Sequence, residues 1–130
     1  MTMNRLEPRH RWIRASRRPR AARSRLRLES ELASDLIAYL DAGPGLRGDL
    51  FAVAEQHVKR HAVRAARSGA FLSHTAAGFL SFRSSFVEQL VRAAARRRLD
   101  PNETAALLAD AVSALDRLLF ALMVGHRSTI

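Results

Sequence analysis

Cysteine is absent from this chain of 130 residues, and proline, glycine and aromatic residues are few. The lack of cysteine excludes disulfides and thiolate metal sites. No apolar run approaches the roughly 18 residues that a membrane-spanning helix needs, and no apolar segment follows the charged N-terminus as in a signal peptide. β-Branched residues are sparse whereas Ala and Leu dominate, which favours helix over strand. We therefore expect a soluble, cytoplasmic, helical protein.

Positive charge is concentrated at one end of the sequence. The net charge is +10. Residues 1–29 hold ten Arg against two Glu, a net +8, and residues 30–130 contribute only +2. Residues 1–27 also contain two prolines and no sustained apolar period, so we expect a basic arm that is disordered in isolation. Residues 28–130 are enough for one helical domain with its own core.

The basic arm has several competing interpretations. Clustered Arg can neutralise nucleic-acid phosphates without reading sequence, and Trp12 could stack on a base. The candidate contacts are Arg11, Arg14, Arg17, Arg18, Arg20, Arg23 and Arg25. However, the chain has 21 Arg and a single Lys, Lys59, a skew typical of compositional bias in the coding DNA. A start site assigned too far upstream and an organelle transit peptide are further alternatives. We favour the compositional explanation over a dedicated nucleic-acid arm.

Two segments with helical periodicity follow the arm. In the first, over about residues 28–42, leucine recurs every four residues, and Gly43 and Pro44 predict its end. The second covers about residues 46–68, with Gly69 as its C-terminal signal. Its expected buried face consists of Leu50, Phe51, Ala54, Val58 and Ala65.

Two more helices are predicted in the second half. The third lies within residues 71–98, with Ser73 as its expected N-cap. The fourth begins with a capping box formed by Asp100 and Glu103 around Pro101, and Gly125 is expected to end it. Its expected buried face consists of Leu107, Leu108, Ala111, Leu115, Leu118, Leu119 and Leu122. Short connections predict antiparallel neighbours, so the fold class is an all-α, antiparallel four- to five-helix bundle.

Arg83 interrupts the amphipathic pattern of the third helix. Its predicted apolar stripe consists of Ala76, Phe79, Leu80, Phe86, Val87, Leu90 and Ala94, and Arg83 falls in the middle of it. A buried guanidinium needs a partner or a path to water. Asp35, Asp110 or Asp116 could pair with it; alternatively its head could reach solvent, or it could line a pocket. Loss of a buried pair in Arg83→Leu would cost about 3–5 kcal/mol, and loss of a pocket arginine far less.

His57 and His61 are spaced to project together from the second helix. That spacing is compatible with a metal, but Lys59 and Arg60 lie between them and no third ligand is evident. We therefore expect no metal site and no haem, and interpret both as hydrogen-bonded residues at the edge of the core. Because both point inward, they could instead form a pocket with Arg83 that receives an anionic ligand.

Catalytic patterns are missing from the sequence. There is no nucleophile–base–acid set and no phosphate-binding glycine loop, and Gly43-Pro44-Gly45 is a turn. An enzyme is therefore not expected. On the fourth helix Phe120 points away from the apolar face, which makes it a candidate for a partner surface.

Residues from about 28 to 128 resemble the N-terminal sensor domain of RsbR-type sigma-B co-antagonists in bacteria. The resemblance is carried by Arg64–Gly69, by Phe79–Arg83, by Leu99–Glu103 and by Leu115–Leu122 followed by Gly125. It implies a bundle or globin-like fold, generally without haem, that forms homodimers and passes a signal to an output domain. No output domain is recognisable here, so the chain could be a stand-alone remnant, a subunit that acts on an output protein in trans, or a truncated reading frame. The expected function is non-enzymatic signalling, with nonspecific nucleic-acid binding and anionic-ligand sensing as alternatives.

Overall fold

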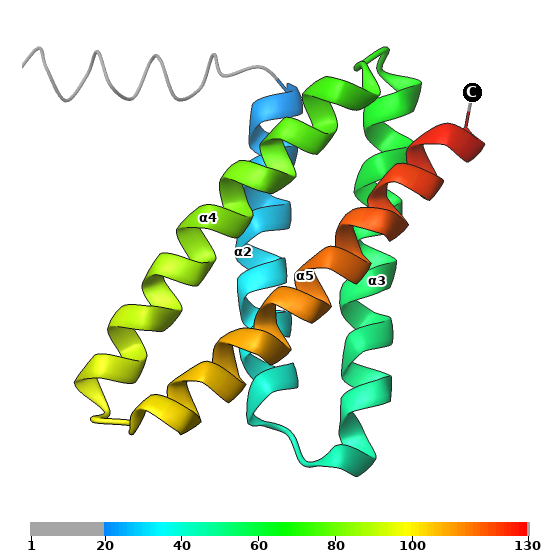
Figure 1. The fold of residues 1–130 in the computed structure, drawn as a ribbon. Coiled ribbons are helices and arrows are strands. Elements are labelled where there is room, and N and C mark those ends of the chain that lie inside the picture. Colours follow the sequence, from blue (N-terminus) through cyan, green and yellow to red (C-terminus); the bar gives the residue numbers. More distant parts are fainter. Residues whose placement is uncertain (1–19, 130) are drawn as a thin grey trace, which may run out of the picture.

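Four helices make up the part of the chain that the structure describes. The computed structural model describes the backbone of residues 20–129 and the side chains of residues 27–129. Its helices are α2 (Arg20–Asp41), α3 (Pro44–Arg67), α4 (Leu72–Arg96) and α5 (Pro101–Ser128) (Figure 1). Residues 20–129 contain no strand. The predicted all-α bundle is thus confirmed.

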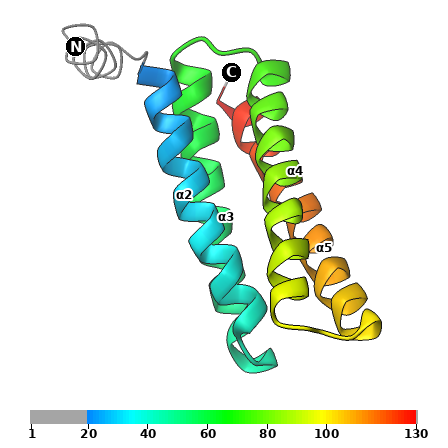
Figure 2. The ribbon, with the colours of Figure 1, turned by 90° about the vertical axis from the view of Figure 1, so that its left-hand side faces the viewer.

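The helices form two antiparallel hairpins, α2–α3 and α4–α5. Figure 2 shows the hairpins as two layers, joined across one end by the connection from α3 to α4. Helix α3 packs mainly against α2 and α5, while α4 packs mainly against α5. Because the chain alternates in direction, α3 and α5 run the same way along their contact (Figure 1). Successive helices are therefore antiparallel, as the short connections predicted.

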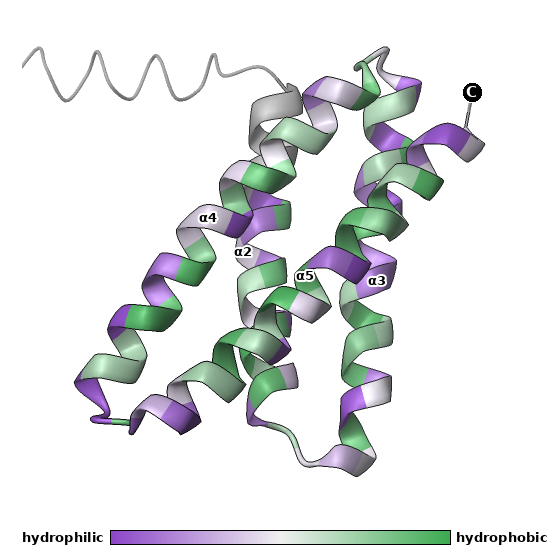
Figure 3. Ribbon diagram, in the orientation of Figure 1, coloured by the Kyte–Doolittle hydropathy of each residue, from purple (hydrophilic) through white to green (hydrophobic). Residues whose placement is uncertain are grey.

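Leucine, alanine and phenylalanine fill one core between the helices. In Figure 3 apolar residues follow most of α5, interrupted by a polar turn near its middle. The expected leucine repeat of α2 is confirmed over Leu28, Leu32 and Leu36, which are buried. The buried members of the other helices are Phe51, Ala54, Val58, Ala62, Phe79, Phe82, Phe86, Ala94, Ala111, Ala114, Leu115, Leu118, Ala121 and Leu122.

Helix α2 begins at Arg20 rather than near residue 28. Arg20, Arg23 and Arg25, which we assigned to the arm, therefore lie within a helix. The reason is local: residues 20–27 consist of Arg, Ala, Leu and one Ser, and the first three types favour helix. Pro19 stands immediately before the helix in the sequence, a place where proline does not oppose helix formation.

The starts of α3 and α4 differ from those predicted. Pro44, read as a helix stop, is the first residue of α3, with Gly43 as N-cap. Ser73 is not the N-cap of α4; Phe71 holds that position and makes no side-chain capping bond. The Phe71 carbonyl instead accepts from the backbone N–H groups of His74 and Thr75. The backbone thus provides at this terminus what a serine hydroxyl was expected to provide.

The start of α5 is as predicted, but its end is not. Glu103 N–H donates to Asp100 Oδ1 at 2.8 Å, and Asp100 N–H donates to Glu103 Oε1 at 3.1 Å, which completes the capping box. Gly125 does not end the helix, which continues to Ser128. A Cβ atom on Gly125 would lie 3.2 Å from the Cβ of Ala62 on α3. Glycine is needed here because α3 and α5 approach closely, not because the helix stops.

The turn after α4 offers a stabilising substitution. Arg98 has a φ of 55°, the left-handed region that disfavours side chains, whereas the comparable turn after α3 uses Gly69 at 86°. Relief of this strain is worth about 1 kcal/mol, so Arg98→Gly should raise the free energy of unfolding by about 0.5–1 kcal/mol. Urea denaturation measures this change. The matched control, Arg92→Gly at an exposed position in the interior of α4, should lower stability by a similar amount.

Candidate functional site

Arg83 lies at the edge of the core and not at its centre. The buried face of α4 is turned toward Phe82, which packs between Phe79 and Phe86 with ring centroids 6.1 and 5.8 Å apart. Leu80, expected to be buried, is exposed. The side chain of Arg83 is 32% exposed, and its Nη2 lies 3.0 Å from Oδ1 of Asp116, which is 57% exposed. Of the three acids proposed as partners, Asp116 makes the pair.

This exposure changes the expected cost of removing Arg83. Exposed ion pairs are screened by solvent and contribute about 0–1 kcal/mol. Arg83→Leu should therefore lower the free energy of unfolding by less than about 1 kcal/mol, and not by the 3–5 kcal/mol of a buried pair. A double-mutant cycle with Asp116→Leu, read by urea denaturation, measures the coupling. A coupling above about 2 kcal/mol would contradict the solvated geometry.

The other two candidate acids pair with different residues. Asp35 Oδ2 lies 2.6 Å from Nδ1 of His57, and Glu31 lies 3.7 Å from Nε2 of the same ring. Asp110 accepts a hydrogen bond of 3.2 Å from Arg47. His57 is therefore held between two carboxylates of α2, in line with our expectation of a hydrogen-bonded residue at the edge of the core.

Arg47 was missed by sequence reasoning. From the first turn of α3 it donates to the carbonyls of Leu40 and Ala42 at 3.2 and 3.3 Å, which lie at the end of α2. Its guanidinium also lies 5.0 Å from the ring centre of Tyr39. An arginine shortly after a helix end is a known way to satisfy the last carbonyls, and this signal could have found it.

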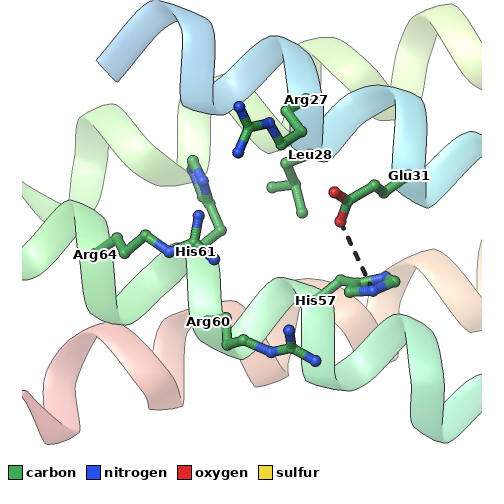
Figure 4. Close-up of a pocket in the computed structure, with 7 residues that line it drawn as sticks. All are labelled: Arg27, Leu28, Glu31, His57, Arg60, His61 and Arg64. Atoms are coloured by element: carbon green, nitrogen blue, oxygen red, sulfur yellow. Dashed lines mark ion pairs between the residues drawn. The ribbon is translucent and has the colours of Figure 1, made fainter. Parts of the chain in front are cut away.

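A small pocket lies between α2 and α3. Its volume is about 130 Å³, and it is lined by Arg27, Leu28, Glu31, His57, Arg60, His61 and Arg64 (Figure 4). The structure thus brings His57 and His61 together at one pocket, as the sequence suggested. Arg83 does not line it and pairs with Asp116 on the other hairpin. The predicted three-residue pocket is therefore wrong in its composition, and three arginines of α2 and α3 take the place of Arg83.

Phe120 is 69% exposed, and it is not alone. The Arg83–Asp116 ion pair shows which positions of the antiparallel helices α4 and α5 lie opposite each other. Leu80 lies one turn before Arg83, and Phe120 one turn after Asp116, so this register places both on the same outer surface. Val124 follows Phe120 by one turn. We call these three exposed residues, Leu80, Phe120 and Val124, the apolar patch.

His126 is a second residue that sequence reasoning missed. It was placed after the end of the last helix, but it lies within α5 and is only 2% exposed. Its Nε2 is 2.9 Å from the Ala70 carbonyl oxygen, in the connection from α3 to α4. Because a carbonyl only accepts, Nε2 carries the hydrogen. His126 therefore ties the end of α5 to that connection.

The remaining predicted site residues are the arginines of the basic arm. Arg11, Arg14, Arg17 and Arg18 lie outside the described residues. Arg20, Arg23 and Arg25 belong to α2, within the part described by its backbone only.

Across the described residues, no three His, Cys, Asp or Glu side chains gather as a metal site would require. Nor does any helix there combine the length and apolar character that crossing a membrane demands.

Comparison of the chain with family models, with curated proteins and with solved structures gives no match. Functional inference therefore starts from two features of the molecule: the apolar patch on α4 and α5, and the basic pocket between α2 and α3.

Proposed function

We propose that this chain is a non-enzymatic regulatory domain of the bacterial signalling type that it resembles, and that it acts through contacts between protein surfaces. The observation that carries this proposal is the apolar patch. Phe120 and Leu80 expose 69% and 44% of their surfaces. Large aromatic side chains at the centre of an exposed patch are typical of protein interfaces.

The occupant that we propose for the patch is a second copy of the chain. A two-fold interface places the same patch on both subunits. One cation and one anion, Arg83 and Asp116, border the patch, so two copies can meet there without like-charge repulsion. In such a dimer Arg83 of each copy can face Asp116 of the other. The strongly cationic segment at the N-terminus of the sequence would repel its own copy and is a poor candidate for self-association.

A bundle that dimerises can transmit a signal by changing how strongly it associates. Any ligand or partner that favours one association state shifts the population by its differential affinity. The resemblance to sigma-factor regulators supports an output protein that acts in trans. Genes of a sigma-factor regulatory set beside the gene for this chain would support that assignment, and neighbours of unrelated metabolism would weaken it.

Sedimentation equilibrium of the full chain over a range of concentrations tests the proposal. We expect a reversible dimer that Phe120→Ser weakens about tenfold or more, because truncation of a central aromatic contact costs about 2 kcal/mol. The matched control is Phe71→Ser, at a phenylalanine that is 79% exposed at the start of α4. It should leave the dimer unchanged.

Two results would overturn this proposal. A wild-type chain that stays monomeric at the highest concentrations would remove the homodimer. A dimer that Phe120→Ser leaves intact would place the interface elsewhere. If the wild-type chain is monomeric, a purified regulatory protein can be tested for saturable binding. Loss of that binding in Phe120→Ser would assign the patch to that protein instead.

A further inference from the structure

We infer that the pocket between α2 and α3 binds a phosphate group. The inference is independent of the proposed dimer, because the pocket lies on the other hairpin. Arg27 contributes one guanidinium from α2, and Arg60 and Arg64 contribute two from α3. In Figure 4 the side chains of Arg27 and Arg64 approach His61 from the two helices, and Arg60 lies nearer His57.

The positive charge of the pocket is compensated only in part by protein carboxylates. Within residues 27–129, none of Arg27, Arg60 and Arg64 forms an ion pair with a carboxylate. Glu31 is the one acid in the lining, and its carboxylate lies against His57. Three exposed guanidinium groups therefore line one small opening against a single carboxylate, and a bound anion would lower the net positive charge there.

Ordinary structural causes explain only part of this cluster. Arg64 lies in the last turn of α3, where a cation interacts favourably with the helix dipole. Arg60 lies one turn earlier on the same face, and two like charges at this spacing destabilise a helix. Arg27 faces them from a separate helix. Neither the dipole nor pairs within a helix account for three arginines of two helices in the lining of one pocket.

The size and the donors of the pocket favour phosphate over larger anions. Its volume of about 130 Å³ is well below the roughly 300–1,000 Å³ of pockets that enclose whole drug-sized ligands. A single tetrahedral phosphate group fits this volume, and the rest of the ligand that carries it would stay outside the pocket. Guanidinium groups bind phosphate oxygens through paired N–H donors, which a lysine cannot reproduce. A free phosphate compound and the backbone of a nucleic acid both carry this group.

The location of the pocket is compatible with binding of either a free phosphate compound or a nucleic-acid backbone. It lies where residues 27–31 of α2 meet the last turns of α3, and residues 1–19 join the chain at the start of α2, seven residues before Arg27. Those residues hold six further arginines in the sequence. A nucleic acid bound here would therefore be close to the attachment point of the basic segment.

An NMR titration of the full chain with inorganic phosphate, against sodium chloride at equal ionic strength, tests the inference. We expect saturable shifts of the His61 ring and of the arginine Nε–H groups of the pocket. Arg27→Gln and Arg64→Gln should each weaken phosphate binding about tenfold, and Arg64→Lys less. The control Arg92→Gln, an exposed arginine of α4, should change nothing. Far-ultraviolet circular dichroism confirms that each variant retains its helices.

A fluorescent oligothymidylate identifies the source of the phosphate. If the source is a nucleic acid, Arg27→Gln and Arg64→Gln weaken oligonucleotide binding and inorganic phosphate competes for the site. If it is a free phosphate compound, oligonucleotide binding survives both variants while phosphate binding is lost. The inference is overturned if phosphate produces no saturable response beyond that of chloride, or if Arg92→Gln weakens binding as much as Arg64→Gln does.

Discussion

Leu118→Ala is expected to lower the free energy of unfolding by about 3 kcal/mol, within the range of about 2–5 kcal/mol for such changes. Leu118 has no exposed surface and belongs to the core cluster that all four helices share. Removal of its three outer carbon atoms loses their burial and leaves a cavity that rigid neighbouring helices cannot fill. Because small domains have only about 5–15 kcal/mol of stability, this one change removes a large part of it.

Urea denaturation followed by circular dichroism measures this loss. Low protein concentration keeps self-association from adding to the apparent stability. The matched control is Leu46→Ala, the same chemical change at a leucine that is 61% exposed, and it should alter stability by less than about 0.5 kcal/mol. Equal losses at the two positions would mean that Leu118 is not at the centre of the core.

The helices were predictable because their signals are local and repeated. The four-residue leucine spacing of α2 and the Asp100–Glu103 capping box each act within a few residues, so both can be recognised from the sequence alone. The two glycines show where this reasoning fails. Gly69 has the left-handed φ of a helix end, as predicted, whereas Gly125 is helical and allows contact with Ala62. Only the packing of α3 on α5 distinguishes these two uses of glycine.

The candidate sites were predicted in part for a related reason. Helical spacing alone places His57 and His61 on the same face of α3. It also places Phe120 on the outer face of α5. The partner of each charged side chain depends on which helices are neighbours. Asp35, Asp110 and Asp116 were all considered for Arg83; they pair with His57, Arg47 and Arg83 respectively. The sequence identified the acids as candidates for pairing but could not assign them.

The sequence analysis was wrong about which face of α4 is buried. The predicted apolar stripe included Leu80, omitted Phe82 and had Arg83 at its middle. The structure buries the three phenylalanines together, because large rings gain most from contact with one another and with the core. That choice turns Leu80 outward and leaves Arg83 at a solvated edge. The apolar patch and the exposed ion pair thus have a common cause.

His126→Ala is expected to lower the free energy of unfolding by about 2–4 kcal/mol. The substitution empties a buried site and removes the hydrogen bond from Nε2 to the Ala70 carbonyl. Since Ala70 belongs to the connection that joins the two hairpins, hydrogen exchange should also become faster around residues 68–71 than elsewhere in the chain. Urea denaturation gives the global loss, and exchange gives its location.

His126→Phe separates the two contributions to that loss. Phenylalanine fills the site with a ring slightly larger than imidazole but cannot donate to the Ala70 carbonyl, at a cost of about 0.5–1.5 kcal/mol. It also removes Nδ1, which is buried with no hydrogen-bond partner among the described residues and which costs about 1–3 kcal/mol to desolvate. The two effects have opposite signs, so His126→Phe should be within about 1.5 kcal/mol of the wild type. If it destabilises the chain as much as His126→Ala does, the hydrogen bond to Ala70 and not the packing holds the two hairpins together at this end.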